Sequence, residues 1–353
     1  MKIQEIQKIL PPDTCALITS DVNRFYLSGF PSSAGSIIIT ENTATLFIDF
    51  RYFEKAQKSV KNMDVRLCKS LYADIKELFK QHNIKNILIE TEHICLDSFE
   101  RMSNALQGFN ILKENTLSQK LNALRQIKSQ DEIELIKKAQ KITDDAFSHI
   151  LNFIKSGVTE KEIALELEFF MRKSGSEGVA FDTIAVSGKN SSLPHGVPTD
   201  KPLEKGDLLT MDFGAVYRGY RSDMTRTIAI GKVTDEQTEI YNTVLKAQTE
   251  ALKTIRPLAV CKDIDKTARD IISAKGYGEF FGHGLGHSVG LEIHENPAFN
   301  TRDETLLQKG MVITVEPGIY LPDKFGVRIE DMIWVTDTGF ENLTKSPKEL
   351  III

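Results

Sequence analysis

Two helix-start signals near the middle of the chain narrow the choice of folds for its larger part. Ser129-Gln130-Asp131-Glu132 has the form of a capping box, in which a serine and a glutamate satisfy the first amide groups of a helix. A second box, Thr159-Glu160-Lys161-Glu162, precedes a helical pattern that ends near Gly175. The apolar residues behind the first box recur at spacings of three and four, as in an amphipathic helix: Ile133, Ile136, Ala139, Ile142, Ala146 and Ile150.

Strand-like segments follow these two predicted helices. Residues 207–216 and 220–230 are rich in apolar and β-branched side chains and are joined by a short turn, which predicts a hairpin. The pattern then repeats more weakly. A T-x-x-Q cap at residues 234–237 leads into helices that end near Gly276, and strands are expected at residues 311–316 and 327–335. We therefore expect two halves, each built from a helix pair and a hairpin.

The first 120 residues or so have a different pattern. Strand-like runs at residues 36–40 and 44–49 alternate with helical stretches such as residues 73–82, which predicts an α/β domain. A chain of 353 residues exceeds what one hydrophobic core usually organises. We expect a smaller domain over residues 1–124, a short connecting segment over residues 121–128, and a larger domain over residues 125–353.

Composition excludes several classes of protein. The chain is 41% hydrophobic and 26% charged, and its net charge of −5 comes without a basic stripe for nucleic acid. Residues 1–5 do not resemble a signal peptide, and no apolar run approaches the roughly 18 residues that span a bilayer. The cysteines form no CxxC pair and are expected to be free, buried thiols: Cys15, Cys68, Cys95 and Cys261. These features predict a cytoplasmic protein that acts on a small molecule or a peptide, without nucleic-acid or membrane partners.

Acidic residues fall on one face of the first predicted hairpin. Alternate side chains of a strand share a face, so Asp212 lies opposite the apolar Met211 and Phe213. On the partner strand, Asp223 shares a face with Thr225 in the same way. Two carboxylates are therefore expected to converge.

The second predicted hairpin carries two more acids, Glu316 and Glu330, by the same alternation. Four carboxylates in an apolar sheet would repel one another and lose solvation, and divalent cations remove that conflict. His287, in the glycine-rich stretch of residues 281–290, is the candidate fifth ligand. A set rich in oxygen ligands favours Mn²⁺ first, or Co²⁺ or Zn²⁺, at two sites about 3.5–4 Å apart.

Five motifs occur in order along the larger part of the chain, and together they resemble the proline-specific branch of the "pita-bread" metallopeptidases, which includes aminopeptidase P and prolidase. The motifs are Asp212-Phe213-Gly214-Ala215, Ser222-Asp223-Met224-Thr225-Arg226-Thr227, His283-Gly284-Leu285-Gly286-His287, Glu316-Pro317-Gly318-Ile319-Tyr320 and Gly326-Val327-Arg328-Ile329-Glu330-Asp331. The N-terminal part resembles the smaller domain of that branch through residues 23–30 and 49–52. The implied fold is α+β, with a C-terminal pita-bread (creatinase/aminopeptidase-like) domain preceded by a smaller α/β domain of the creatinase/prolidase N-terminal kind.

The resemblance also implies residue roles. Asp212 and Asp223 would bind one metal ion, Asp223 and Glu330 would bridge both ions, and His287 and Glu316 would complete the second site. His195 and His294 fall on positions implied to contact substrate and intermediate, and Glu316 is implied to help in proton transfer. On the substrate side we also place His283 and Arg328, and we expect Arg328 to orient a carboxylate by charge-assisted hydrogen bonds. Tyr320 and Trp334 are expected to serve in packing.

The implied activity is hydrolysis of the bond between an N-terminal residue and proline, by an Xaa-Pro aminopeptidase or an Xaa-Pro dipeptidase that forms a homodimer. Three alternatives stay open. A methionine aminopeptidase-like enzyme would share the metal ligands but lack the extra N-terminal domain. A creatinase-like hydrolase or a non-catalytic binding module of the same fold would dispense with the metal.

Overall fold

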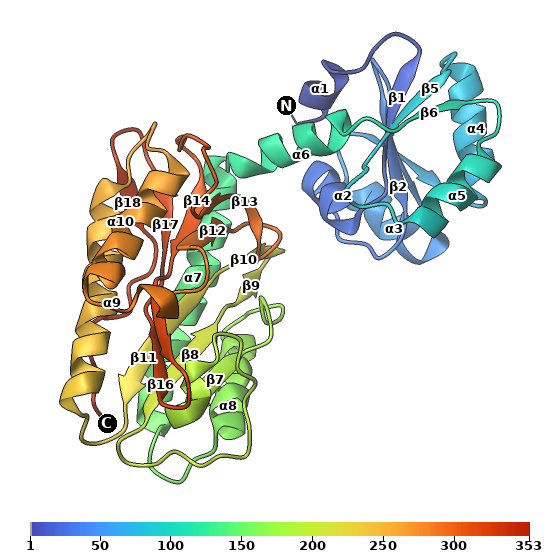
Figure 1. Cartoon of the computed structure of the whole chain (residues 1–353). Helices are drawn as coiled ribbons and strands as arrows, with labels where there is room; N and C mark the ends of the chain where they lie inside the picture. The colour runs from blue at the N-terminus through green and yellow to red at the C-terminus, as the bar shows by residue number, and fades with distance from the viewer. Residues whose placement is uncertain (1) are drawn as a thin grey trace. The chain divides into compact units, whose positions relative to one another are not determined.

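The computed structural model describes residues 2–353, which form two compact units (Figure 1). The first unit ends at Arg125 and the second begins at Gln126.

The first unit is built on a mixed sheet. Within residues 2–125 its six strands follow the order β4-β3-β2-β1-β5-β6. The strand β1 pairs antiparallel with β2 and parallel with β5. The strands are β1 Thr14–Ile18, β2 Ser36–Ile39, β3 Ala44–Ile48, β4 Asp64–Leu67, β5 Asn86–Ile89 and β6 Asn110–Leu112. The helices are α1 Lys2–Gln7, α2 Asp21–Ser28, α3 Phe50–Ser59, α4 Leu71–Gln81, α5 Leu96–Ala105 and α6 Thr116–Gln126.

The helix α6 covers most of the stretch that the sequence suggested was only a short connection. Leu117 and Leu121 are fully buried, and they lie four residues apart on one face of the helix. The connecting segment is therefore helical to Gln126, and only Ile127 and Lys128 separate it from Ser129, the cap residue of the next helix.

Two helices open the second unit, as the capping boxes predicted: α7 Gln130–Phe153 and α8 Glu160–Lys173. In both boxes the hydroxyl accepts from the third helical amide, and the glutamate accepts from the amide of the cap residue. All six apolar residues of the predicted stripe on α7 are buried. A third box, Thr234 with Gln237, starts α9 Asp235–Thr254, which is followed by α10 Cys261–Ala274.

The strands of the second unit fall into two sheets and two short ribbons. Within residues 126–353 the sheets have the orders β11-β8-β7 and β13-β12-β14-β17-β18, and β9–β10 and β15–β16 are separate ribbons. The first group is β7 Ile184–Ser187, β8 Leu208–Phe213, β9 Val216–Tyr217, β10 Tyr220–Arg221 and β11 Met224–Ala229. The second group is β12 Gly286–Ser288, β13 Glu295–Phe299, β14 Val312–Val315, β15 Gly318–Leu321, β16 Phe325–Arg328, β17 Asp331–Val335 and β18 Phe340–Asn342. Short 3₁₀ turns cover Gly188–Ser192 and Gly278–Phe280.

The predicted long strands are interrupted where acids occur. Residues 207–216 and 220–230 do not form one continuous hairpin, because β8 ends at Phe213 and β11 begins only at Met224. Ser222 lies in this gap, where its hydroxyl accepts from the Ala215 amide at 2.9 Å. A Cβ on Gly214 would lie 2.0 Å from the Ser222 carbonyl oxygen. The main chain at residue 214 can therefore approach that at residue 222 this closely only because residue 214 is glycine.

The second predicted hairpin is also interrupted. Residues 327–335 are divided between β16 and β17, with Glu330 outside both strands. The strand β14 pairs with β17, but the ribbon β15–β16 lies between them in the sequence. The two strands therefore do not form a simple hairpin.

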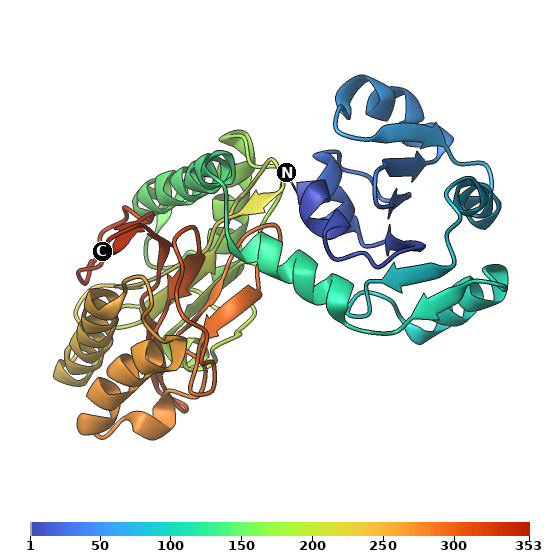
Figure 2. The same cartoon turned by 90° about the horizontal axis from the view of Figure 1, so that it is seen from above.

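Helix pairs cover the strands on opposite sides in both views of the second unit (Figures 1 and 2). The helices α7 and α8 pack on β7, β8 and β11 through a core that includes Phe147, Leu167 and Phe213. The helices α9 and α10 pack on the larger sheet and on β15–β16 through a second core that includes Tyr241, Ile264 and Ile333. The structure thus has the predicted α+β class with two halves of helix pair and strands.

All four cysteines are free, as expected, but not all are buried. Cys15 and Cys261 are buried, Cys68 is intermediate and Cys95 is exposed at the start of α5. Across residues 2–353, no helix combines the length and apolar character needed to cross a bilayer.

Candidate metal centre

A cavity of about 710 Å³ opens in the second unit, and every predicted site residue contributes to its wall. These residues are His195, Asp212, Asp223, His283, His287, His294, Glu316, Arg328 and Glu330. They come from segments up to 135 residues apart, which the two sheets and their connecting ribbons bring together.

Asp212 and Asp223 enter the cavity from adjacent strands. Asp212 in β8 pairs in register with Thr225 in β11, and Asp223 immediately precedes β11. The Asp223 side chain is almost fully buried. The alternation predicted from the sequence therefore holds, although Asp223 belongs to the break and not to the strand.

His287 is placed by close contact between β12 and β14. A Cβ on Gly286 would lie 2.0 Å from the Thr314 carbonyl oxygen, so only glycine allows the strands to approach this closely. The Thr314 hydroxyl accepts from the His287 amide at 3.0 Å. His287 Nδ1 lies 3.2 Å from the Ser288 carbonyl oxygen, which can only accept, so Nδ1 carries the proton. The lone pair of Nε2 then faces Asp223 Oδ2 at 3.6 Å and Glu316 Oε1 at 3.3 Å.

Threonine hydroxyls orient the two glutamates. The Thr314 hydroxyl donates to Glu316 Oε1 at 2.9 Å, and the Thr225 hydroxyl donates to Glu330 Oε2 at 2.7 Å. The amide of Glu330 also donates to the Thr225 carbonyl oxygen at 3.1 Å. Each glutamate is thus held through one oxygen.

The buried acids of the cluster have raised pKa values. Burial, and then the neighbouring carboxylates, raise the pKa of Asp223 and of Glu330 well above the ordinary values. Burial also raises the pKa of Glu316, and it lowers the pKa of His287. Burial therefore already favours the neutral imidazole that a cation requires, but it disfavours the charged carboxylates, and a bound cation would reverse the balance for these acids.

The residues fit a bound cation. One ligand atom from each of Asp223, His287 and Glu330 lies within 4.8 Å of the others. Among the residues described, Asp212 Oδ1 and Glu330 Oε1 are buried oxygens without a hydrogen-bond partner. Buried carboxylate oxygens are rarely left unpaired, and a hard divalent cation satisfies them. Glu316 Oε1 lies 3.3 Å from His287 Nε2 and so adjoins these three residues. Asp212 Oδ2 is already paired with Arg328.

Arg328 links the carboxylates to the opposite wall. Its guanidinium donates to Asp212 Oδ2 at 2.6 Å, to the Thr225 hydroxyl at 3.0 Å and to the Tyr320 hydroxyl at 2.8 Å. Burial opposes the charge of Arg328, but Tyr320, Asp212 and Glu316 raise its pKa well above the ordinary value. Arg328 therefore orients a carboxylate, as the sequence predicted.

Tyr320 has more than the packing role expected of it. Burial raises its pKa to about 12, so the hydroxyl stays protonated. The hydroxyl accepts from Arg328 and lies 3.0 Å from His283 Nε2. His283 Nδ1 faces the Gly284 carbonyl oxygen at 2.8 Å, so the imidazole has its proton there and Nε2 accepts from Tyr320. The threonines and Tyr320 were missed because their residue types are equally frequent in packing.

His195 and His294 are exposed side chains that line the same cavity. The His294 ring packs edge-on against the His287 ring, with 4.4 Å between the ring centroids. Partial burial lowers the pKa of His294, and the nearby His287 and His195 lower it further. Apolar side chains also line the cavity, including Phe181, Val197 and Ile293, together with the polar Asp182, Thr183 and Asn300. The cavity thus has a charged floor and a wall suited to an apolar ligand group.

Known proteins match both units. The Metallopeptidase family M24 matches residues 134–337, and the Creatinase/Prolidase N-terminal domain matches residues 13–127. An Xaa-Pro dipeptidase of Pyrococcus furiosus is 41% identical over 335 residues, which cover 95% of this chain and 94% of the relative. The structure of an Xaa-Pro dipeptidase from Bacillus anthracis has a TM-score of 0.96 at 42% identity, covering 100% of this chain and 99% of the other. The structure of an X-Pro aminopeptidase from Thermotoga maritima has a TM-score of 0.91 at 41% identity, with coverage of 96% and 97%.

The paired helices, the two sheets and the acidic cavity with its histidine define a metallopeptidase that depends on divalent metal ions. The chain belongs to the Metallopeptidase family M24 and carries the N-terminal domain of the creatinase and prolidase group.

Proposed function

We propose that the chain is an Xaa-Pro exopeptidase that hydrolyses the bond between an N-terminal residue and proline in short peptides. The observation that carries the proposal is the group of buried acids around His287, two of whose oxygens have no partner among the described residues, at the floor of a cavity large enough for a small peptide. Relatives that carry the name Xaa-Pro dipeptidase or X-Pro aminopeptidase support the choice of substrate.

The metal would be held by Asp212, Asp223, His287, Glu316 and Glu330, and we propose two ions, with Mn²⁺ preferred over Co²⁺ or Zn²⁺. Such ions, when bound, polarise a carbonyl group and lower the pKa of water. The carboxylate set supports this choice because it is rich in hard oxygen ligands.

The chain's own residues would bind the peptide and handle the proton. His195 and His294 face the cavity from the wall beside the carboxylates, where an imidazole N–H can donate to an oxygen that gains charge during hydrolysis. Glu316 would pass a proton to the proline nitrogen, which must be protonated as it leaves. His283 and Arg328 would bind on the substrate side, while Arg328 also keeps Asp212 in place.

Proline makes this bond a special substrate. Its nitrogen belongs to a tertiary amide and offers no N–H, so a site that needs that donor binds the bond poorly. The apolar wall around Phe181, Val197 and Ile293 offers a surface for the pyrrolidine ring.

A peptide assay tests this proposal. Mn²⁺-loaded protein should hydrolyse Ala-Pro, Ala-Pro-Ala or both, and should leave Met-Ala-Ser intact. Cleavage of Ala-Pro alone identifies a dipeptidase, and cleavage of Ala-Pro-Ala identifies an aminopeptidase. Hydrolysis of Met-Ala-Ser in preference to both would favour the methionine aminopeptidase alternative. Binding without any hydrolysis would favour the non-catalytic module.

We also propose a homodimer and a cytoplasmic location. The homodimer implied by the family resemblance is tested by light scattering after gel filtration, where a mass of twice 39.7 kDa is expected. The cytoplasmic location predicted from the sequence is tested by cell fractionation.

A further inference from the structure

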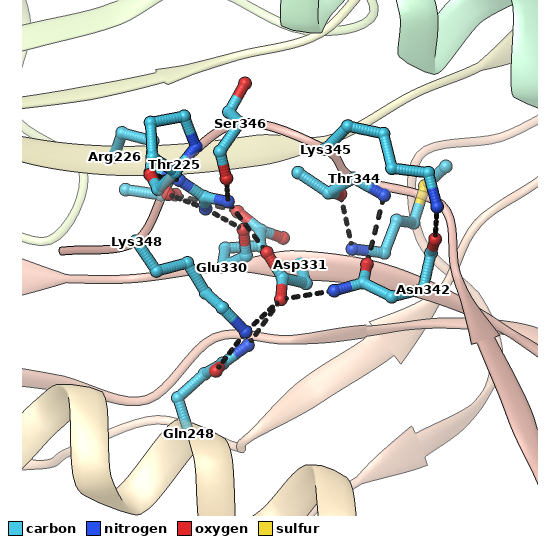
Figure 3. Close-up of polar contacts among 12 residues, drawn as sticks. Thr225, Arg226, Gln248, Glu330, Asp331, Asn342, Thr344, Lys345, Ser346 and Lys348 are labelled. Atoms are coloured by element: carbon cyan, nitrogen blue, oxygen red, sulfur yellow. Dashed lines mark hydrogen bonds and ion pairs between the residues drawn. The ribbon is translucent and has the colours of Figure 1, made fainter.

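Glu330 lies at a point where no strand pairing fixes its carbonyl group. It follows β16, which ends at Arg328, and precedes β17, which begins at Asp331. Its amide donates to the Thr225 carbonyl oxygen. Its own carbonyl oxygen accepts from Arg226 Nη1, which also donates to the Thr225 carbonyl oxygen at 2.9 Å. The Arg226 guanidinium therefore joins β11 to the segment that carries Glu330 (Figure 3).

Arg226 is saturated with acceptors. Nη2 donates to Asp331 Oδ1 at 2.8 Å and to the Ser346 carbonyl oxygen at 2.8 Å, and Nε donates to the Pro347 carbonyl oxygen at 2.9 Å. With the two bonds of Nη1, all five N–H donors of the guanidinium are used. The side chain is only 1% exposed. A lysine has three donors without this fork geometry and cannot replace these contacts.

Asp331 holds the guanidinium in place. Its other oxygen, Oδ2, accepts from Lys348 at 2.7 Å, from Asn342 at 2.8 Å and from Gln248 at 3.0 Å (Figure 3). Asp331 is fully buried and lies outside the set of described residues that line the cavity. Consecutive residues here thus face opposite ways, with Glu330 toward the metal centre and Asp331 toward Arg226.

We propose that Arg226, held by Asp331, is a positioning residue for the metal centre. It fixes the main chain of both Thr225 and Glu330, and the Thr225 hydroxyl then sets the Glu330 carboxylate. The inference rests on the proposed function, because it requires that Glu330 bind a metal ion. Without the Arg226 guanidinium, Glu330 would stay in the site but would be held less firmly. Loss of a residue that supports a metal ligand typically weakens metal binding about 10–100-fold.

The test compares Mn²⁺ dissociation constants of metal-free proteins by titration calorimetry, with folding checked by circular dichroism. The variants are Arg226→Lys, Asp331→Asn and a control, Asp144→Ala. Asp144 also anchors the 345–346 segment, through the amides of Lys345 and Ser346 and the Ser346 hydroxyl, but these contacts include neither Arg226 nor Glu330. We expect Arg226→Lys to bind Mn²⁺ about 10–100-fold more weakly and Asp144→Ala to bind as the wild type does.

A second measurement distinguishes an effect on the geometry of the metal ligands from a general loss of structural order. The visible absorption spectrum of Co²⁺-loaded protein reports the ligand geometry, so we expect it to change in Arg226→Lys and to stay unchanged in Asp144→Ala. A folded Arg226→Lys protein with wild-type affinity and spectrum would overturn the inference. An equal loss of affinity in Asp144→Ala would overturn it as well.

Asp331→Asn decides the case if Arg226→Lys does not fold, since asparagine keeps the shape of the side chain and removes its charge. Weaker Mn²⁺ binding by the folded Asp331→Asn protein supports the inference, and wild-type binding overturns it. A wild-type protein that binds no Mn²⁺, Co²⁺ or Zn²⁺ would instead overturn the proposed function, so the two failures are distinguishable.

Discussion

Two threonine hydroxyls each orient one glutamate carboxylate in this cavity by a hydrogen bond. Thr225 donates to Glu330 and accepts from Arg328, while Thr314 donates to Glu316 and accepts from the His287 amide. Each hydroxyl uses one carboxylate oxygen; at Glu330 the other, Oε1, has no partner among the described residues. The acids are therefore oriented before any cation binds, and less reorganisation is needed on binding.

Glu330→Ala should abolish turnover and reduce the bound metal, because it removes a carboxylate that has no substitute in the buried group. We expect kcat/KM to fall by more than about 100-fold, beyond the usual loss for an outer partner. Metal content is measured by mass spectrometry and turnover with Ala-Pro. Glu304→Gln is the control, because Glu304 is an exposed acid paired with Lys262. A fully active, metal-free Glu330→Ala protein would refute the ligand assignment.

His294→Ala should lower kcat while the metal stays bound. The imidazole faces the cavity but is not one of the three residues whose ligand atoms meet. A positioned acid, base or hydrogen-bond donor of this kind contributes about 10²–10⁴-fold to the rate. Steady-state kinetics at saturating Mn²⁺ provide the measurement. An unchanged kcat would remove His294 from the mechanism.

The sequence predicts the cavity residues better than their supports. Alternation along the strands was enough to direct Asp212 and Asp223 the same way, and the glycines beside His287 indicated a close crossing. Arg226 gives no such signal, because an arginine in a strand usually faces solvent. Its five acceptors come mostly from main-chain carbonyls, which are invisible to residue type.

At the scale of elements, the breaks in the strands matter most. The predicted strands over residues 207–216, 220–230 and 327–335 are apolar enough to be continuous, yet each is interrupted beside or at a site acid. Asp223, Glu316 and Glu330 all lie just outside a strand, where the main chain can turn the carboxylate into the cavity. Propensity cannot show these breaks, because the contacts that compensate for lost pairing are tertiary.

Gly286→Ala tests the close crossing of β12 and β14. The added methyl group would lie 2.0 Å from a main-chain oxygen that cannot rotate away, so the strands must separate. We expect a loss of about 1–3 kcal/mol in the free energy of unfolding, together with weaker metal binding through His287. Gly282→Ala is the matched control, since a Cβ there meets nothing within 4 Å. Equal stability of the two variants in urea would contradict the account of this crossing.

At the scale of the whole molecule, helices were the most predictable part of the sequence. The three capping boxes mark the starts of α7, α8 and α9, because local hydrogen bonds define a helix start without help from the fold. The α+β class and the metallopeptidase family also follow the expectation. The helix α6 was missed because the burial of Leu117 and Leu121 depends on tertiary packing, which the local sequence does not show.

Metal should stabilise the second unit, because the gathered carboxylates repel one another without it. A ligand whose free concentration is about 100 times its dissociation constant raises the free energy of unfolding by about 2.7 kcal/mol. For a unit of this size that corresponds to a rise of about 5–10 °C in Tm. Differential scanning calorimetry with and without Mn²⁺ measures the shift. Equal Tm values in EDTA and in Mn²⁺ would contradict a metal site among these acids.

The central claim is that Asp212, Asp223, His287, Glu316 and Glu330 hold the ions on which hydrolysis depends. Its most direct test is the rate of Ala-Pro and Ala-Pro-Ala hydrolysis as Mn²⁺ is titrated into exhaustively chelated protein. We predict no hydrolysis without metal and a rate that saturates at about two ions per chain, as a paired site requires. Hydrolysis that persists undiminished after complete chelation would contradict the claim.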